Sequence, residues 1–423
     1  MKKLADMNRT ELNAFKVSLE EKFNELKKRG LKLDMSRGKP SSAQLDLSMP
    51  LLDVLSGQSL KVGEADIRNY GILDGISPAK KLFADLLEVL PENIFVGGSA
   101  SLNLMYDIIA KAYTHGLLNS EKPWAKLERV RFLCPAPGYD RHFAISDSFS
   151  MDMITIPMTS SGPDMDLVEE MVKDPTVKGM WCVPKYSNPD GITYSDETVK
   201  RISSLKPAAP DFLLMWDNAY CVHEFDGEFE PFLDILSECA KAGNPNMPFE
   251  FASTSKITFP GSGISCFACS KENMAYMKKL WNVETISYDK INQLRHALFL
   301  VDKEHTIAHM KKHAAIMRPK FDIVIDFLER EIAPYDFASW HRPKGGYFVS
   351  LYCMEGTAKR THSLCKELGV VMTGAGATYP YGHDEKDSNL RIAPSLPPET
   401  ELREAMTVLC VCLKLAAVEQ LLK

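Results

Sequence analysis

Hydrophobic positions near the start of the chain follow helical spacing. Apolar residues recur at steps of three and four, which places them on one face of a helix: Leu12, Phe15, Leu19, Phe23 and Leu26. Thr10 is a suitable N-cap for this helix, and Gly30 is suited to the position just past its end. The pattern therefore predicts an amphipathic helix with one buried face.

From about residue 90 the pattern changes to short apolar runs separated by longer segments of helical character. Seven runs are predicted as strands: 93–96, 129–133, 153–157, 179–183, 212–216, 249–252 and 264–269. The runs are continuously apolar, as in strands that are covered on both faces. Because most are separated by crossover-length segments, we expect an α/β fold with a mainly parallel seven-stranded sheet.

The last third of the chain is predicted to be mostly helical. Apolar residues again step by three and four, at Ile307, Met310, Ala314, Met317, Phe321, Val324 and Leu328. Arg318-Pro319 interrupts this stripe, so we expect a kinked helix or two abutting helices. Strand-like runs follow at 345–349, 370–373 and 390–393, and a closing helix begins near Pro397.

Composition and charge exclude several classes of protein. The 423 residues carry a formal charge of −6, and 45% are hydrophobic and 25% charged, which is typical of a globular protein. A nucleic-acid-binding protein would show a basic surface and a high pI, whereas the pI here is about 6.0. Any site for an anion must therefore be built from a few local groups.

The sequence favours a cytoplasmic protein without a metal. No apolar run of the kind found in signal peptides follows Met1, and no uncharged apolar stretch of about 18 residues predicts a membrane span. The ten cysteines are scattered, and Cys266 and Cys269 form a CxxC within a strand-like run that lacks a second pair. We interpret them as buried thiols rather than as a zinc or redox site.

Four polar motifs follow predicted strands. Lys256 comes after the hydroxyl-rich Ser253-Thr254-Ser255, and Asp217 ends the run at 212–216. Asn188 lies in an Asn-Pro-Asp-Gly turn, and the small residues 97–101 precede a helical segment that could receive a phosphate. Taken singly, these motifs also fit an exposed lysine, a turn-capping acid, a plain turn and a tight connection. Because the carboxyl ends of parallel strands share one edge, we expect the four to converge there.

In order and spacing, these motifs resemble those of fold-type I pyridoxal-phosphate (PLP) aminotransferases, and more closely the aspartate aminotransferase branch often labelled MocR-like. The resemblance covers nearly the whole chain. It rests on Ser36-Arg37-Gly38-Lys39-Pro40, Asn69-Tyr70-Gly71, Gly98-Ser99-Ala100-Ser101, Pro135-Ala136-Pro137-Gly138-Tyr139, Ser187-Asn188-Pro189-Asp190-Gly191, Asp217-Asn218-Ala219-Tyr220, Ser253-Thr254-Ser255-Lys256 and Asn389-Leu390-Arg391-Ile392-Ala393.

The resemblance implies a role for each matching residue around pyridoxal 5′-phosphate. Lys256 matches the Schiff-base lysine that also moves a proton, and Asp217 the partner of the ring nitrogen. Asn188 and Tyr220 match the donors to the ring oxygen O3′, and Tyr139 the aromatic residue stacked on the ring. The phosphate cradle is matched by Ser99, Ala100, Ser101, Ser253 and Ser255.

Two further features concern the phosphate. Tyr70 matches a tyrosine that reaches the phosphate from a neighbouring subunit, which implies a homodimer. Many relatives carry an arginine a few residues after the lysine, but residues 257–265 contain no cation. Lys185 is a candidate for its replacement, and the alternative is that Lys185 faces solvent.

The substrate is expected to be an amino acid with two carboxylates. Arg391 matches the arginine that clamps the α-carboxylate, and Gly38 the loop glycine that closes over it. Arg37, Lys39 or Arg141 is a candidate for the distal carboxylate, with a surface charge as the alternative. The resemblance implies a ping-pong aminotransferase that acts on aspartate and 2-oxoglutarate.

The resemblance also implies two domains: a large cofactor-binding domain at 50–290, and a smaller α+β domain formed by 1–49 and 291–423. Two other functions remain open. Fold-type I also includes carbon–sulfur lyases and decarboxylases, because the protein selects which bond the cofactor breaks. MocR-type regulators use a similar domain as a sensor, but the roughly 35 residues before Gly38 are too few for a winged helix-turn-helix.

Overall fold

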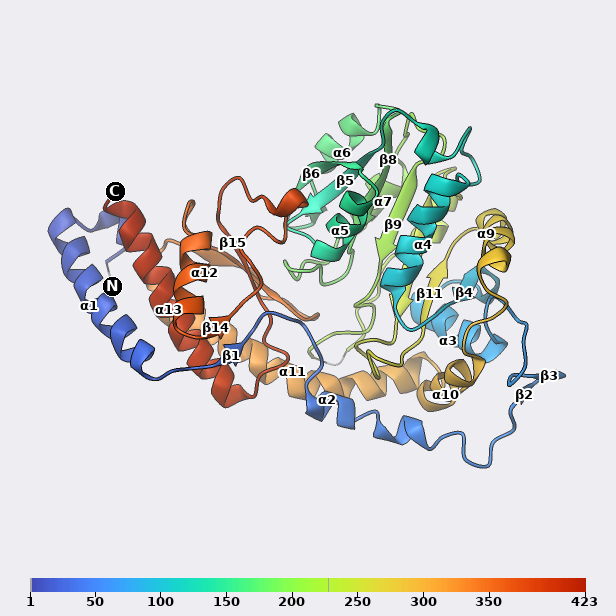
Figure 1. Ribbon diagram of the computed structural model, residues 1–423, viewed down its shortest axis with the longest axis horizontal. Coiled ribbons are helices and arrows are strands. Elements are labelled where there is room, and N and C mark those ends of the chain that lie inside the picture. Colours follow the sequence, from blue (N-terminus) through green and yellow to red (C-terminus); the bar gives the residue numbers. More distant parts are fainter. Residues whose placement is uncertain (1, 227) are drawn as a thin grey trace.

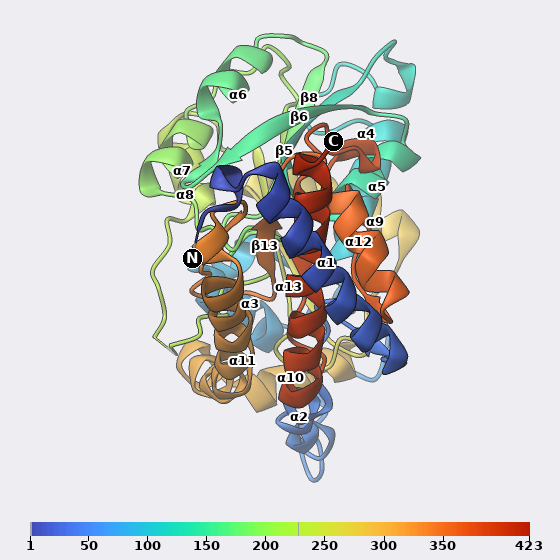
Figure 2. The ribbon, with the colours of Figure 1, turned by 90° about the vertical axis from the view of Figure 1, so that its left-hand side faces the viewer.

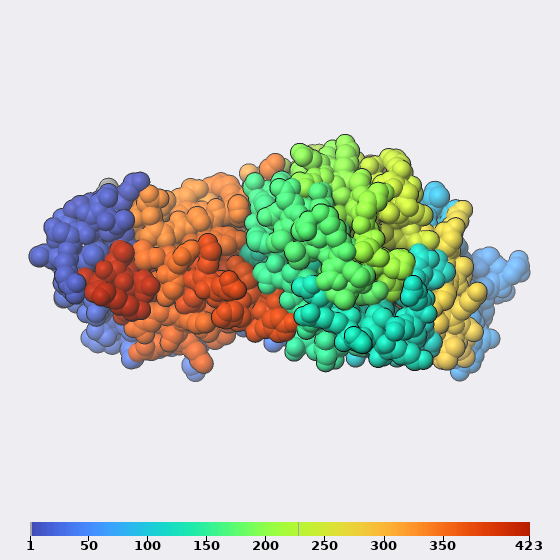
Figure 3. Space-filling model, turned by 90° about the horizontal axis from the view of Figure 1, so that it is seen from above, coloured from blue at the N-terminus to red at the C-terminus, as the bar shows by residue number. Residues whose placement is uncertain are grey.

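The fold is described by a computed structural model that covers residues 2–226 and 228–423. The chain forms two halves, and the long helix α11 (Lys303–Glu331) runs along both of them (Figure 1). The space-filling view shows the N-terminal helix at one end of an elongated molecule, beside the C-terminal helix (Figure 3). The domain boundaries at residues 50 and 290 stay a prediction.

One half is built around a mixed sheet. Its eight strands lie in the order β4 (Ile94–Val96), β11 (Ser265–Ala268), β10 (Pro248–Ser253), β9 (Leu213–Asp217), β8 (Val177–Cys182), β5 (Arg131–Ala136), β6 (Asp152–Thr159) and β7 (Gly162–Pro163). The five strands from β10 to β6 are mutually parallel, whereas β11 is antiparallel to both of its neighbours. All seven predicted strands are present. The predicted number is corrected to eight, because β7 is a two-residue strand folded back on β6 and is too short to leave a hydrophobic pattern.

Helices cover both faces of this sheet, which explains the continuously apolar strands. One face packs against α4 (Ser101–Thr114), α5 (Asp140–Ser148) and α9 (Lys271–Glu284). The other face packs against α3 (Ser77–Leu87), α10 (Lys290–Leu300), α6 (Met165–Met171), α7 (Asp196–Ser203) and α8 (Ile235–Lys241). The carboxyl ends of the parallel strands are left open to the other half of the molecule.

The cysteines are buried and unpaired, as predicted. Cys266 packs on one face of the sheet with Ile264 and Ala268, whereas Cys269 packs on the opposite face with Phe267. Side chains that alternate along a strand point to opposite faces, so this CxxC cannot direct both thiols to one ion.

The second half combines small sheets with packed helices. Its strands are β12 (Ser339–Trp340), β13 (Val349–Tyr352) and β15 (Asn389–Ile392), and β1 (Leu33–Asp34) pairs in parallel with β14 (Val370–Val371). Helix α13 (Glu399–Leu421) packs against α1 (Arg9–Lys28), α11 and α12 (Ala358–Glu367) (Figure 2). Short elements complete the fold: α2 (Ser42–Asp46) and the hairpin of β2 (Lys61–Val62) and β3 (Ala65–Asp66).

The start of α1 differs from the sequence prediction. Asn8, rather than Thr10, caps the helix: its side chain accepts from the Glu11 backbone N–H at 3.0 Å, and the Glu11 carboxylate accepts from the Asn8 backbone N–H at 2.7 Å. This reciprocal pair satisfies two free donors and so fixes the earlier start. Gly30 adopts a φ of +61° just past the helix, as its position predicts.

Two long helices carry the core of the second half. Helix α11 runs through Pro319 as a single helix, so of the two alternatives expected from the sequence, a kinked helix or two abutting helices, the second is wrong. Met317 and Phe321, on either side of the proline, are buried, and their packing outweighs the loss of one backbone hydrogen bond. Helix α13 is long and apolar enough to span a membrane, but 72% of its apolar window is buried, and it serves here as a core helix.

Candidate active site

A cavity of about 550 Å³ lies at the carboxyl ends of the parallel strands, where residues of both halves meet. It is lined by Arg37, Gly38, Lys39, Ala100, Ser101, Tyr139, Arg141, Asn188, Asp217, Tyr220, Ser253, Ser255, Lys256 and Arg391, all of which are candidates from the sequence. Among the described residues, three candidates from the sequence do not line it: Ser99, Tyr70 and Lys185. The predicted convergence of the four motifs on one sheet edge is therefore observed.

Lys256 lies three residues beyond the end of β10. Its Nζ is 5.0 Å from the centre of the Tyr220 ring and 5.7 Å from that of Tyr347. Burial lowers the pKa of Lys256, while the charge of Asp217 acts in the opposite direction. A lowered pKa makes the neutral amine more available, which suits a nucleophile or a proton carrier.

Asp217 is the last residue of β9 and is almost completely buried. One carboxylate oxygen, Oδ2, is 3.1 Å from Nε2 of His142, whereas Oδ1 is buried and has no hydrogen-bond partner among the described residues. An unpaired buried carboxylate oxygen is costly, so this atom is suited to accept a proton-bearing nitrogen from a ligand.

His142 was not predicted from the sequence. It lies in the first turn of α5, three residues after Tyr139, and stacks on Trp181 with ring centres 4.4 Å apart. The only sequence signal is this spacing, which places His142 beside Tyr139, with ring centres 5.0 Å apart. The stack on Trp181 fixes the His142 ring, and the hydrogen bond from this ring fixes the orientation of the Asp217 carboxylate.

Hydrogen-bond donors lie on both sides of the cavity. Burial raises the pKa of Tyr220 well above its ordinary value of 10 and that of Tyr139 to about 12, so both hydroxyls stay protonated at neutral pH. The Asn188 side-chain oxygen accepts from Nη1 of Arg391 at 3.2 Å. Its amide nitrogen is therefore left as a donor.

The residues predicted to cradle a phosphate comprise a helix start and two serine hydroxyls. Ala100 is the N-cap of α4, and no side chain caps this helix. The Ser253 hydroxyl donates to that of Ser255 at 3.1 Å, and the Ser255 hydroxyl donates to the backbone oxygen of Ser99 at 3.4 Å. Ser99 thus borders the cradle through its backbone. Free N–H groups at a helix start, together with hydroxyls, suit a phosphate.

Tyr70 does not contact this cavity within one chain. Its side chain is 81% exposed, in the segment that follows the projecting β2–β3 hairpin (Figure 1). Contact with a phosphate would therefore require a second copy of the chain.

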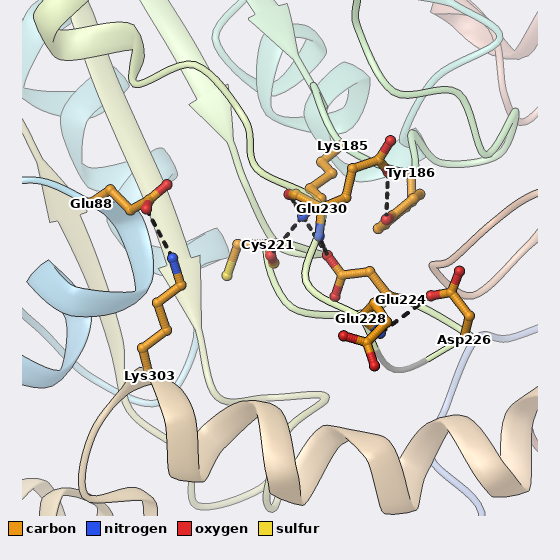
Figure 4. Close-up of polar contacts among 9 residues, drawn as sticks. All are labelled: Glu88, Lys185, Tyr186, Cys221, Glu224, Asp226, Glu228, Glu230 and Lys303. Atoms are coloured by element: carbon orange, nitrogen blue, oxygen red, sulfur yellow. Dashed lines mark hydrogen bonds and ion pairs between the residues drawn. The ribbon is translucent and has the colours of Figure 1, made fainter.

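Lys185 does not serve the phosphate, and it does not face solvent either. It is buried, and its Nζ donates to Glu224 at 2.5 Å and to the backbone oxygens of Cys221 and Glu230 at 3.0 and 2.8 Å (Figure 4). All three ammonium hydrogens are therefore used. The role considered for Lys185 from the sequence is wrong, because Lys185 links the Asn188 turn to the segment after Tyr220.

Arg391 lies on β15 and crosses to the opposite half of the molecule. Its Nη1 donates to Oδ1 of Asp140 at 2.9 Å, and its Nη2 to the Thr373 hydroxyl at 3.2 Å. Its Nε is buried and finds no hydrogen-bond partner in residues 2–226 and 228–423, and its guanidinium carbon lies 4.8 Å from the centre of the Phe348 ring. The sequence did not point to Asp140 or Thr373, because their pairing with Arg391 depends on the tertiary fold.

Gly38 fits this arrangement for a steric reason. A Cβ atom at position 38 would lie 2.5 Å from the Phe348 ring, well inside van der Waals contact. A side chain at position 38 would therefore require the Phe348 ring or the loop that carries Arg37 and Lys39 to move.

Buried histidines support the segment that follows Lys256. The ring of His309 hydrogen-bonds to the backbone oxygen of Ile257 at 2.9 Å, and that of His296 to the Thr258 hydroxyl at 3.0 Å. His313 lies 3.2 Å from His309 through their Nε2 atoms. Burial lowers the pKa of each ring, to about 4 for His296 and about 3 for His313.

These histidines predict a loss of stability in weak acid. Above pH 6.5 the rings are neutral in both the folded and unfolded states, but at lower pH the unfolded chain takes up protons first. Each pKa unit is worth about 1.4 kcal/mol, so His296 alone should remove about 3 kcal/mol between pH 6.5 and 4. Urea unfolding followed from pH 7 to 5 should show a falling midpoint. The fall should be shallower in His296→Gln, and equal slopes would contradict the assignment.

Comparisons with known proteins identify relatives over nearly the whole chain. The family model for aspartate amino-transferase matches residues 7–423. The chain is 46% identical to an aspartate aminotransferase of Corynebacterium glutamicum over 98% of this chain and 96% of that protein. It is also 46% identical to a putative aminotransferase of Mycolicibacterium smegmatis over 95% and 94% of the two chains.

The fold gives the same result. A crystal structure of an aspartate transaminase from Corynebacterium glutamicum superposes with a TM-score of 0.97 at 46% identity, covering 99% of both chains. An α-aminoadipate aminotransferase from Thermus thermophilus, at 20% identity, shares the fold with a TM-score of 0.72. With a family model that matches nearly the whole chain and relatives of this identity, the protein belongs to the aspartate aminotransferase family.

Proposed function

We propose that the protein is a pyridoxal-phosphate-dependent aminotransferase that exchanges an amino group between aspartate and 2-oxoglutarate, in the MocR-like branch of its family. The family membership supports the reaction class, and the order of the sequence motifs supports the branch. The observation that carries the proposal is a pair of buried atoms without a hydrogen-bond partner among the described residues, on two residues that line one cavity: Oδ1 of Asp217 and Nε of Arg391. One is suited to a ring nitrogen and the other to a carboxylate.

The residues present fit pyridoxal 5′-phosphate. When bound, this cofactor supplies an electron sink that stabilises negative charge at the substrate α-carbon. Asp217 would hold a proton on the ring nitrogen, Tyr220 and Asn188 would donate to the ring oxygen, and the start of α4 would receive the phosphate. Lys256 would attach the cofactor and carry the proton that leaves the α-carbon, for which its lowered pKa is suited.

The cations of the cavity support a dicarboxylate substrate. Arg37, Lys39 and Arg141 line it, and none of them forms an ion pair within residues 2–226 and 228–423. With Arg391 committed to the α-carboxylate, these free charges are available for the distal one. Arg37 and Lys39 flank Gly38, so the loop that covers the substrate also carries the charge that recognises it.

Arg37→Ala and Lys39→Ala should therefore lower kcat/KM for aspartate by about tenfold or more, and that for alanine far less. The measurement is a panel of amino donors with 2-oxoglutarate, with release of ammonia and carbon dioxide assayed in parallel. Amino transfer with a preference for aspartate supports the proposal. Equal losses of kcat/KM for both donors would show that these residues do not recognise the distal carboxylate. Release of ammonia or carbon dioxide without amino transfer would indicate a lyase or a decarboxylase.

We further propose a cytoplasmic homodimer in which Tyr70 reaches the neighbouring cavity. Exposed apolar side chains on two adjoining elements support an interface: Met49 (49% exposed), Leu52 (51%), Ile291 (38%) and Leu298 (38%). The ten buried, unpaired cysteines fit a reducing compartment. Sedimentation equilibrium measures the mass, and a fully active monomer would contradict the proposal.

A further inference from the structure

The carboxylate of Asp140 already binds the arginine that is expected to clamp the substrate. Asp140 is the first residue of α5 and lines the cavity. Its Oδ1 accepts from Nη1 of Arg391 at 2.9 Å, across the boundary between the two halves. The Asp140 side chain is 33% exposed and that of Arg391 is 7% exposed, so the pair lies at the wall of the cavity rather than on the outer surface.

This contact limits what Arg391 can offer a ligand. A guanidinium has five N–H donors. Nη1 donates to Asp140 and to the Asn188 oxygen, and Nη2 donates to Thr373. Two donors remain, namely the unpartnered Nε and the second hydrogen of Nη2. A substrate carboxylate that binds there must approach a guanidinium that already carries a negative partner.

We propose that Asp140 is an internal competitor of the substrate α-carboxylate, and that it weakens the binding of every amino acid and 2-oxo acid at Arg391. The inference rests on the proposed function in taking Arg391 as the α-carboxylate clamp. Two carboxylates that bind the same guanidinium repel each other, and this repulsion weakens the binding of the carboxylate that is free to dissociate. Asp140 is fixed by the chain, so the substrate or product leaves.

Such a competitor suits an enzyme that releases a product in each half of a ping-pong reaction. Both substrates and both products carry the same α-carboxylate, so Asp140 acts on all four alike. Binding that is weakened equally in the ground and transition states raises KM without changing the chemical step. Asp140 therefore lowers the affinity for substrates and products and speeds product release, which raises turnover where product release limits the rate.

The decisive variant is Asp140→Asn, which keeps the shape and the hydrogen-bond acceptor but removes the charge. Nη1 of Arg391 already donates to the amide oxygen of Asn188, so it can also donate to the amide oxygen of an asparagine at position 140. We expect the KM values for both the amino donor and 2-oxoglutarate to fall by about fivefold or more, with no rise in kcat. Calorimetry of the cofactor-loaded protein should show acetate and succinate binding more tightly by the same factor.

Two controls separate competition from other effects. Asp147→Asn removes the same charge from the exposed far end of α5, outside the cavity lining, and should leave KM unchanged. Asp140→Glu keeps the charge and should not tighten binding. A KM that rises in Asp140→Asn, or binding within twofold of the parent protein, would overturn the proposal and leave Asp140 as a residue that orients Arg391.

The outcome is independent of which donor the enzyme prefers. If aspartate proves not to be the donor, Asp140→Asn should still tighten the true donor and acetate, because the competition concerns the α-carboxylate. If no amino transfer occurs at all, the proposed function fails, but the acetate and succinate titrations still report on Asp140 and Arg391.

Discussion

Lys256→Ala is expected to reduce aminotransfer by about 10⁴-fold or more, the upper range of what one positioned acid–base group contributes. Lys256 and Lys39 are the lysines that line the cavity, and Lys256 is the one that follows β10 beside Tyr220. Its loss removes the amine that attaches the cofactor and the group that carries the proton. Single-turnover and steady-state rates with aspartate measure the effect, and the visible absorption of the loaded protein reports attachment.

Lys256→Arg is the matched control for charge. Arginine keeps the positive charge near Asp217 but does not lose its proton in proteins, so it should be as inactive as alanine while preserving the thermal unfolding midpoint. Activity in Lys256→Arg would show that charge alone is required.

A mixture of two variants tests whether Tyr70 acts across a dimer interface. Lys256→Ala and Tyr70→Ala should each be inactive or weak alone. In a mixed dimer, the cavity of the Tyr70→Ala subunit keeps its own Lys256 and receives the native Tyr70 of the Lys256→Ala subunit, so mixing should restore activity.

The part of the site that could be predicted consists of residues placed by strand ends. Asp217, Asn188 and Lys256 each follow an apolar run that is a parallel strand, and parallel strands align their carboxyl ends. The runs themselves were predictable because both faces of the sheet are covered. The strand β7 was not, because two residues carry no periodicity.

The part that could not be predicted depends on partners distant in the sequence. Lys185 is buried because Glu224, 39 positions later, neutralises it, and nothing near Lys185 indicates that pairing. His142 and Asp140 precede Asp217 and Arg391 by 75 and 251 positions. Burial and charge pairing over such separations are properties of the packed fold, so a local pattern cannot specify them.

Asp217→Asn is expected to lower kcat by about 10²–10³-fold, the loss typical of removing one preorganised electrostatic partner in a buried site. The amide keeps the size of the side chain and can still pair with His142, but it cannot provide the negative charge that holds a proton on a ring nitrogen. The unpartnered Oδ1 is the atom affected. Saturating rates with aspartate, together with a fluorescence titration of cofactor affinity, measure the two consequences separately.

His142→Phe separates charge from orientation in the same pair. Phenylalanine can retain the stack on Trp181 but loses the 3.1 Å contact to Oδ2, while the charge of Asp217 remains. Because the charge is what stabilises the protonated ring, His142→Phe should cost about tenfold or less. If Asp217→Asn and His142→Phe lower kcat equally, the orientation of the carboxylate is the decisive property. If Asp217→Asn stays within threefold of the parent enzyme, Asp217 is not the electrostatic partner of the cofactor.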